Sequence, residues 1–296
     1  MNCKNLYHEV VPRVLTVYKQ KDMFWLIGWV GGVMLLWLWN RLFLNYPAFV
    51  QIQGAFINTF LIALLCIVFS AALAWSVAVG LHFLPNSRTP YLKLPLTFLL
   101  NLIRSIPQIL GVLGGYVVIT LMISNEILAS RSVIILLLGL VTSLFVFQEL
   151  ADLIRERIDH YSKLDFVNAM LCCGVKESRI INIDILWKNS MAHVTNKLIA
   201  LFGIAIFLQC SVDFIISVGL STEVSPVNLP TTLGSMLAKI DSKQDILAIG
   251  YTLTHPGYIG NLFFRHLQGI STAFLIVFTL LSMHRISTGF SRRHSL

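Results

Sequence analysis

Hydrophobic residues form long, nearly uncharged stretches along this chain, and short polar segments separate them. A helix needs about 20 apolar residues to cross the roughly 30 Å hydrocarbon core of a bilayer. Six runs reach or approach that length, and we expect each to form a membrane-spanning helix. They cover residues 23–39, 57–84, 94–123, 132–154, 191–220 and 258–283. The pattern therefore predicts an all-α, polytopic membrane protein with six transmembrane helices.

The predicted spans divide the chain into three parts. Residues 1–22 form a cytoplasmic N-terminal segment, residues 23–285 the transmembrane domain, and residues 286–296 a cytoplasmic tail. The first span has tryptophan at both ends and no small-residue cleavage site after it, which favours an uncleaved anchor over a signal peptide. The segment before it has apolar residues at helical spacing, at Leu6, Val10, Val14 and Val17. It is either an amphipathic helix on the inner membrane surface or a partly ordered tail.

The basic residues beside the apolar runs predict the orientation of the spans. Six spans place both termini on one side, and fifteen lysines and arginines fall on that side. Five fall on the opposite side: Arg41, Arg131, Lys239, Lys243 and Arg265. Because cytoplasmic loops carry the excess of lysine and arginine, both termini are predicted to be cytoplasmic. We expect fusion reporters after Lys163 to score cytoplasmic.

Charge and cysteine content exclude several other classes of function. The net charge is +8, but the basic residues form no single patch interleaved with aromatics, so nucleic-acid binding is not indicated. The eight histidines show no ligand spacing, and the cysteines no CxxC pairing, so neither a metal site nor a disulfide framework is expected. The five cysteines are Cys3, Cys66, Cys172, Cys173 and Cys210.

The sequence DFVNAMLCCGVKESRIINIDILWKN, residues 165–189, lies in a cytoplasmic interval at about 155–190, between the fourth and fifth predicted spans. The interval is longer than a tight turn requires, so it is a surface loop or a docking element. Its acidic first residue suits a helix N-terminus. An apolar face follows at helical spacing: Phe166, Ala169, Met170 and Cys173. Gly174 then permits a sharp turn, so we predict a helix, a glycine turn and a second helix.

This segment resembles the cytoplasmic EAA loop of ABC-transporter permease subunits, most closely that of the dipeptide, oligopeptide and nickel permease family. The family's loop carries an acid, an aromatic residue, an alanine pair, a glycine, and an arginine before two isoleucines. The resemblance implies ATPase coupling for the matching residues, which are Asp165, Phe166, Ala169, Met170, Gly174 and Arg179. The chain departs from the family's pattern at Val175, Lys176, Asp184 and Trp187.

Two further regions resemble the same family. Residues 211–237 are similar to its E-x-x-L-S-F-L-G-L-G stretch and the P-x-x-x-W-G-x-M-L group after it, with Asp213 at the acidic position and Gly234 in the final group. RSIPQIL, residues 104–110, resembles the arginine and proline that enter the family's third span. The family's G-T-D-x-x-G-R-D and N-L-L-G-D-G-L-R-D segments are missing, so the substrate does not follow from the resemblance.

The resemblance implies a permease subunit in the bacterial inner (cytoplasmic) membrane, forming half of a translocation path for peptides or a related small solute. No G-x-x-x-x-G-K-[ST] motif occurs, so this chain is not expected to hydrolyse ATP by that route. Partner subunits are expected to bind ATP and magnesium. The chain itself is therefore not expected to be an enzyme or to bind a cofactor. The implied partners are a second homologous permease, two cytoplasmic ATPase subunits and, for an importer, an external solute-binding protein. An exporter of polyamines or peptides and a non-transporting membrane scaffold remain alternatives.

Three residues inside the predicted spans are candidates for the translocation path. Arg104 either snorkels to the inner head groups or contacts substrate. Pro107 bends the third span or marks a gate beside the path. Asp213 lies toward the outer part of the fifth span, where an ionisable residue faces the bundle or water, and it serves transport or a structural hydrogen bond. The small residues at 111–115 and 70–74 are expected to allow close helix packing.

Overall fold

The computed structural model describes residues 21–84, 91, 93–219 and 229–294. Within these ranges every regular element is a helix. The predicted N-terminal amphipathic helix lies outside the described residues. The all-helical prediction is therefore confirmed for the part of the chain that the structure describes.

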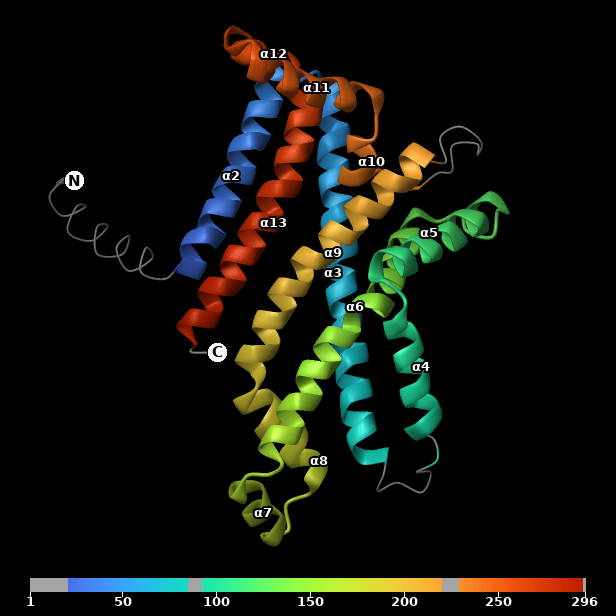
Figure 1. The fold of residues 1–296 in the computed structure, drawn as a ribbon, viewed down its shortest axis with the longest axis vertical. Helices are drawn as coiled ribbons and strands as arrows, with labels where there is room; N and C mark the ends of the chain where they lie inside the picture. The colour runs from blue at the N-terminus through green and yellow to red at the C-terminus, as the bar shows by residue number, and fades with distance from the viewer. Residues whose placement is uncertain (1–20, 85–90, 92, 220–228, 295–296) are drawn as a thin grey trace, which may run out of the picture.

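Five of the described helices are long and apolar enough to cross a bilayer. They are α2 (Lys21–Phe43), α3 (Tyr46–Phe83), α6 (Arg131–Tyr161), α9 (Met191–Gly219) and α13 (Leu267–Arg293). They run lengthwise through the molecule in Figure 1. The first, second, fourth and fifth predicted spans correspond to four of them, although α3 begins 11 residues earlier than predicted and α6 ends seven residues later. These helices extend past the hydrophobic runs because polar turns at their ends are also helical.

The third predicted span is wrong as a single straight helix. It is broken into α4 (Lys93–Ser105) and α5 (Gln108–Ser124), whose axes differ by 95°. Pro107 lies at the break and precedes the first turn of α5. Proline lacks an amide hydrogen and disfavours helical geometry in the residue before it, so the α4 helix cannot continue through Ile106. The pair is either one broken span or a re-entrant segment, so the described residues contain five or six candidate spans.

The sixth predicted span begins too early. Residues 258–265, which the hydropathy pattern assigned to it, belong instead to two short elements, η4 (Pro256–Tyr258) and α12 (Ile259–Arg265). After a bend at His266, α13 begins only at Leu267. Two more helices precede them, α10 (Leu233–Leu237) and α11 (Ile240–Thr254). The apolar pattern runs through this break, because α12 exposes apolar side chains without being part of the span.

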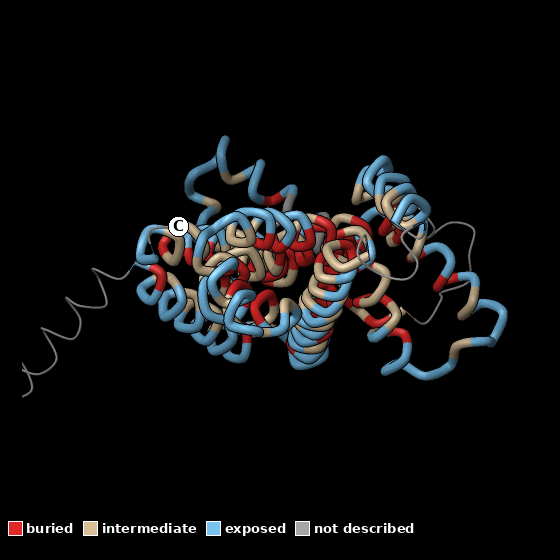
Figure 2. The backbone as a smooth tube through the Cα atoms, turned by 90° about the horizontal axis from the view of Figure 1, so that it is seen from below, coloured by how far each residue is buried: buried red, intermediate tan, exposed pale blue. Residues whose placement is uncertain are grey.

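Close packing of α3, α6 and α9 forms the centre of the bundle, whereas α2 contributes little to it. Of the α2 residues, only Asp22 and Asn40 are buried. Figure 2 shows the buried residues gathered in the interior, with exposed residues on the outward faces. The α2 helix joins the rest through α13: the Trp29 indole donates to Thr279 Oγ1 over 3.1 Å, and Arg293 pairs with Asp22 at 2.9 Å.

Small residues bring α5 against α6, as the sequence predicted for residues 111–115. A Cβ added to Gly111 would lie 2.2 Å from the Phe145 ring, and one added to Gly115 would lie 2.2 Å from the Val141 side chain. Contacts that short require the neighbouring side chain to move. The β-branched Val141 has little freedom to do so, so Gly115 in particular is required for the observed distance between the helices. Gly114, in contrast, faces open space.

The directions of the helices agree with the predicted alternation of sides. The start of α2, the end of α3, the segment between α6 and α9 and the end of α13 all point toward the lower side of Figure 1, and the α2–α3 connection and α10–α12 lie toward the upper side. This arrangement groups the segments that the lysine and arginine distribution also groups. That the lower side is cytoplasmic stays a prediction; below we call it the inner side.

Candidate functional site

The segment between α6 and α9 folds as a helix, a glycine turn and a second helix, as the sequence predicted. The first helix is α7 (Asp165–Cys172), and Gly174 after it has φ of +79°. The Gly174 amide donates to the Leu171 carbonyl over 2.9 Å, and the Val175 amide to the Met170 carbonyl over 3.1 Å. These are the two hydrogen bonds of a Schellman motif, which needs a left-handed residue where glycine is favoured.

The second helix begins as one α-turn, α8 (Glu177–Arg179), and continues as a π-helix, η3 (Ile180–Asn189). The isoleucine-rich face of η3 is buried in the main core, at Ile180, Ile181, Ile185 and Leu186. A π-helix of this length is unusual, and such segments are frequent at functional sites. The buried residues recur five positions apart, which suits the wider turn of a π-helix. The apolar but exposed Ile183 and Trp187 obscure this spacing, so the sequence did not predict the π-helix.

Contacts from α3 and α6 hold this segment in place. The Trp75 indole donates to Asn182 Oδ1 over 2.9 Å, and His82 Nε2 lies 3.2 Å from Glu177 Oε1. From α6, the Tyr161 ring packs edge-on against Phe166, with 6.5 Å between ring centroids. The α7–η3 segment is thus fastened to the inner ends of two core helices. The hydrophobic pattern of the sequence did not predict the contact between His82 and Glu177.

The predicted apolar face of α7 is divided between two sides of the helix, which corrects the sequence interpretation. Phe166 and Met170 are half-buried against the chain's own core and Val167 is buried between them, whereas Ala169 and Cys173 are exposed. The other residues that the resemblance assigned to coupling, Asp165, Gly174 and Arg179, are also exposed. We define the coupling tip as seven of the exposed residues of this turn: Asp165, Ala169, Leu171, Cys172, Cys173, Gly174 and Arg179.

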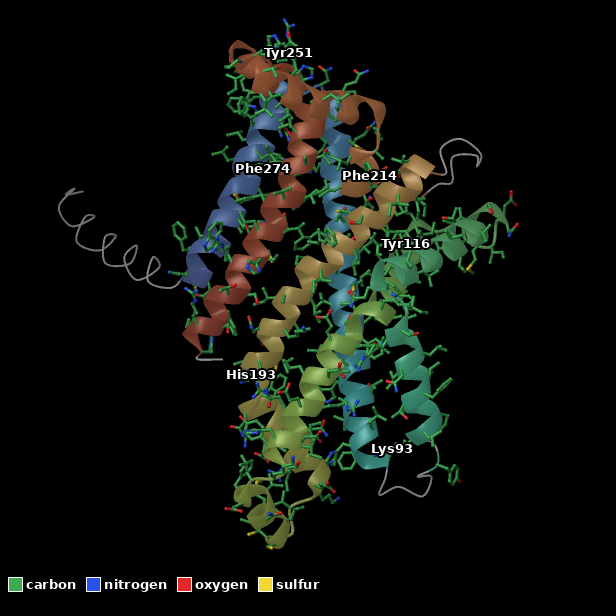
Figure 3. All side chains as sticks on the ribbon, in the orientation of Figure 1. Lys93, Tyr116, His193, Phe214, Tyr251 and Phe274 are labelled. Atoms are coloured by element: carbon green, nitrogen blue, oxygen red, sulfur yellow. The ribbon has the colours of Figure 1, made fainter. Side chains whose placement is uncertain are left out.

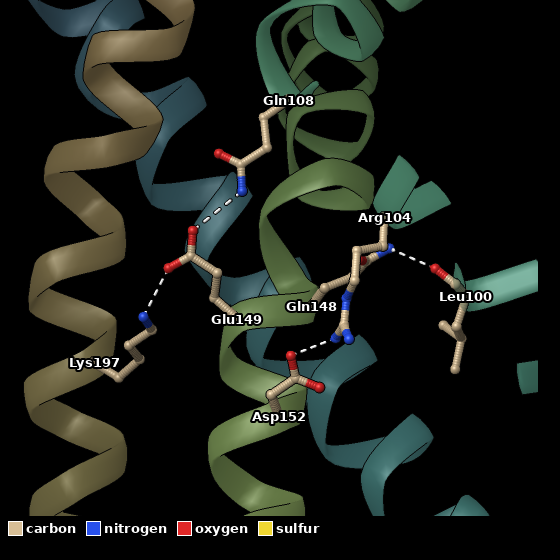
Figure 4. Close-up of polar contacts among 7 residues, drawn as sticks. All are labelled: Leu100, Arg104, Gln108, Gln148, Glu149, Asp152 and Lys197. Carbon is tan, nitrogen blue, oxygen red and sulfur yellow. Dashed lines mark hydrogen bonds and ion pairs between the residues drawn. The ribbon is translucent and has the colours of Figure 1, made fainter. Parts of the chain in front are cut away.

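Polar side chains from α4, α5, α6 and α9 converge beside the α4–α5 break (Figure 4). Arg104 forms an ion pair with Asp152. One turn away, Glu149 accepts a hydrogen bond from Gln108 Nε2 over 3.1 Å and pairs with Lys197 Nζ at 2.7 Å. We call these five residues the polar clamp. Arg104 and Gln108 flank Pro107, so the clamp fixes both sides of the bend to α6 and, through Glu149, to α9.

Two residues of the clamp, Glu149 and Asp152, belong to a polar face of α6. Glu149, Asp152, Glu156 and Asp159 follow at spacings of three and four residues, so they lie on one side of the helix. The Arg104 and Asp152 side chains are each about half exposed, at 54% and 50%. Charged groups are costly against lipid, so this face fits water or a partner chain better than it fits the hydrocarbon. The sequence had singled out Arg104 and Pro107 here but not Glu149 or Lys197.

Asp213 lies at the other end of α9 and fastens α10 to the bundle. The Thr232 hydroxyl donates to Asp213 Oδ2 over 2.6 Å, and Thr232 also caps α10 in a capping box with Ser235. A Cβ on Gly234 would lie 2.3 Å from the Cys210 carbonyl, so the backbone of α10 touches α9 directly. The structure therefore shows Asp213 in a hydrogen bond that holds α10 against α9, and its role in transport stays a prediction.

Two contacts from α3 complete the docking of α10. The Leu233 amide donates to Thr59 Oγ1 over 2.9 Å, and Asn58 Nδ2 donates to the Thr231 carbonyl over 2.7 Å. Figure 3 shows the separation of the two ends: Phe214, next to Asp213, is high on α9, whereas His193 is near its lower end. Of the three predicted path residues, Arg104 and Pro107 therefore lie at the α4–α5 break, whereas Asp213 lies at the other end of the bundle.

Comparison with known proteins assigns no family: no protein-family model matches the chain, and no curated protein is significantly similar to it. In the residues that the structure describes, no three histidine, cysteine, aspartate or glutamate side chains gather in a way that would hold a metal ion.

Proposed function

We propose that this chain is a permease subunit of an ABC transporter and forms half of the translocation path for peptides or a related small solute. The observation that carries the proposal is the coupling tip, an exposed helix–glycine–helix corner at the inner end of a bundle of apolar helices. In this proposal two cytoplasmic ATPase subunits bind the tip and supply ATP and magnesium. A second, homologous permease forms the other half of the path, and an importer also uses an external solute-binding protein.

The contacts behind the tip supply a route for mechanical coupling. A force on α7 reaches α3 through the Trp75–Asn182 and His82–Glu177 contacts, and it reaches α6 through Tyr161 and Phe166. The polar clamp then joins α6 to the bent α4–α5 pair. ATP-driven closure of the ATPases would bias two arrangements of these helices, one open to each side of the membrane.

The polar face of α6 supports a path on the α4–α6–α9 side of the molecule. Its charged groups are best accommodated by a water-filled space, and the second permease would close that space from the opposite side. In this arrangement Arg104 and Pro107 lie beside the inner mouth of the path. Asp213 lies outside it and keeps the outer end of the bundle closed on α10.

The test perturbs the tip at its glycine. Gly174→Trp adds bulk where the structure leaves open space, and it also strains the turn, because φ at this position is +79°. Gly174→Asn is the matched variant, because asparagine tolerates the left-handed backbone and is small. We expect Gly174→Trp to insert normally, to lose co-purifying ATPase and to abolish transport. Gly174→Asn should retain most of both activities.

A control on the same segment is Lys188→Ala, because the Lys188 side chain is exposed and lies beyond the tip. It should change neither ATPase association nor uptake and efflux. Full association and full transport by Gly174→Trp would contradict the proposal. If the wild-type chain binds no ATPase at all, the scaffold interpretation replaces it. Transport without any solute-binding protein would identify an exporter.

A further inference from the structure

A pair of short helices closes the outer end of the molecule, and neither is long enough to cross a bilayer. α11 has 15 residues and α12 has seven, whereas a span needs about 20. The turn η4, with Pro256 and Gly257, separates them. Figure 1 shows the pair lying across the upper ends of α2 and α13. Because no described helix covers the outward side of this pair, its surface must meet something else.

The outward side of the α11–α12 pair is apolar and exposed. Residues 246–264 contain no lysine, arginine, aspartate or glutamate. The large exposed side chains include Leu247, Tyr251, Leu253, Ile259, Phe263 and Phe264, and Leu253 is 82% exposed. The opposite side of α11 is buried at Asp245 and Ala248, which are three residues apart. The helix is therefore amphipathic, with one face packed on the protein and one apolar face uncovered.

Hydrogen bonds fix this orientation. Asp245 accepts from His266 Nδ1 at 2.9 Å with one oxygen and from the Gly269 amide at 2.8 Å with the other. The Tyr258 hydroxyl lies 2.9 Å from His266 Nε2. The carboxylate thus joins α11 to the first turn of α13, where negative charge is stabilising, and the histidine joins it to η4. The apolar face is held outward and does not result from a loose end of the chain.

The contacts with α2 indicate the depth of this face in the membrane. At 23 residues, α2 is roughly 34 Å long, close to the thickness of the hydrocarbon core, so its last turn lies at the outer boundary. The Trp39 indole donates to the Phe263 carbonyl over 3.3 Å, and the Phe264 ring lies 5.0 Å from the Phe43 ring. α12 therefore lies at the depth where tryptophan and tyrosine form interfacial belts.

We propose that the α11–α12 pair lies in the outer head-group region of the bilayer and inserts its exposed apolar side chains among phospholipid acyl chains. The occupant of this face is the lipid monolayer, because α12 contacts α2 at Trp39 and Phe43, next to the exposed apolar side chains Leu38 and Leu42. Its uncharged surface offers little to the polar rim of a soluble partner. Amphipathic helices with such a face bind the interface in this way. The inference stands independently of the proposed transport function.

Collision accessibility of spin labels tests the assignment in the full chain. The five native cysteines are replaced by alanine, and a label is attached at Leu253→Cys or, separately, Leu247→Cys in phospholipid vesicles. Both side chains are exposed, so neither change removes a packing contact. Leu35→Cys on the exposed face of α2 supplies the lipid reference, and Asn125→Cys in the exposed turn after α5 supplies the aqueous reference.

We expect the labels at positions 247 and 253 to collide with oxygen at a high rate, as the label at Leu35 does. Their collision rate with aqueous nickel ethylenediaminediacetate should be several-fold lower than that of the label at Asn125. Accessibility to the nickel reagent equal to that at Asn125 would show that the face meets water and would overturn the proposal. An immobilised label that neither reagent reaches would show a protein on this face and would overturn it as well. The two label positions must agree for the lipid assignment to stand.

Discussion

The ion pair between Glu149 and Lys197 is predicted to stabilise the bundle by far more than an exposed pair does. Glu149→Ala removes the partner of the Lys197 ammonium and of the Gln108 amide, with atoms at 2.7 Å and 3.1 Å. Both side chains of the ion pair are about one third exposed, at 34% and 28%. Breaking a fully buried pair costs about 3–5 kcal/mol, and an exposed pair contributes about 0–1 kcal/mol.

We therefore expect Glu149→Ala to lower the free energy of unfolding by about 1–3 kcal/mol, which lies between those limits. The double variant Glu149→Ala with Lys197→Ala should recover part of the loss, because it no longer leaves an unpaired ammonium inside the bundle. The assay is thermal unfolding of the purified chain in detergent, followed by tryptophan fluorescence, for the two single variants and the double variant.

The control is Lys188→Ala, which removes a 63% exposed lysine from an i,i+4 pair with Asp184. It should change the free energy of unfolding by less than about 0.5 kcal/mol. Equal effects of Glu149→Ala and Lys188→Ala would refute the argument that the clamp is a stabilising contact. A double variant that simply adds the two single losses would show that Glu149 and Lys197 do not interact.

The remaining predictions concern α10, the α5–α6 contact and topology. Asp213→Ala should lower the melting temperature more than Asp213→Asn, because the amide oxygen of asparagine still accepts from the Thr232 hydroxyl; equal losses would show that this hydrogen bond is unimportant. Gly115→Leu should destabilise the chain by about 1–3 kcal/mol by forcing α5 away from α6, measured by thermal unfolding, and a neutral result would contradict the close approach. Reporter fusions after Lys163 should score cytoplasmic and fusions after Tyr46 external, and the reverse scores would invert the assigned orientation.

The sequence predicted the features that arise from local pattern. The long apolar runs predicted the helices. Gly174 predicted the turn with positive φ, because few other residues adopt that conformation. Pro107 gave the position of a bend, but not its size. Its 95° angle depends on Arg104 and Gln108 meeting acids on α6, which lie 48 and 41 residues further along the chain. Such long-range pairs leave no trace in a hydropathy pattern.

The sequence-based predictions were wrong where hydrophobic residues are exposed or lie outside a spanning helix. Residues 258–265 are apolar enough to extend a span, yet α12 lies outside α13 because the chain turns at His266. The apolar face of α7 was assigned from residue type and helical spacing, and only the positions of α3 and α6 decide that Phe166 faces inward while Ala169 does not. The position of Asp213 was predicted, but its partner Thr232 comes from a segment whose return to the bundle no local signal announces.

The π-helix η3 gives the connection from the coupling tip to α9 a winding that differs from the helices on either side. Its hydrogen bonds span one residue more than those of an α-helix, so each turn of this ten-residue helix contains more residues than a turn of an α-helix. Each residue of an α-helix turns the chain by roughly 100°. Rewinding η3 into α-helical geometry would therefore rotate one neighbouring helix about its own axis relative to the other. A change of winding at residues 180–189 would turn the side chains of α9 toward new neighbours. The buried residues of η3, which recur five positions apart, would then no longer share one face.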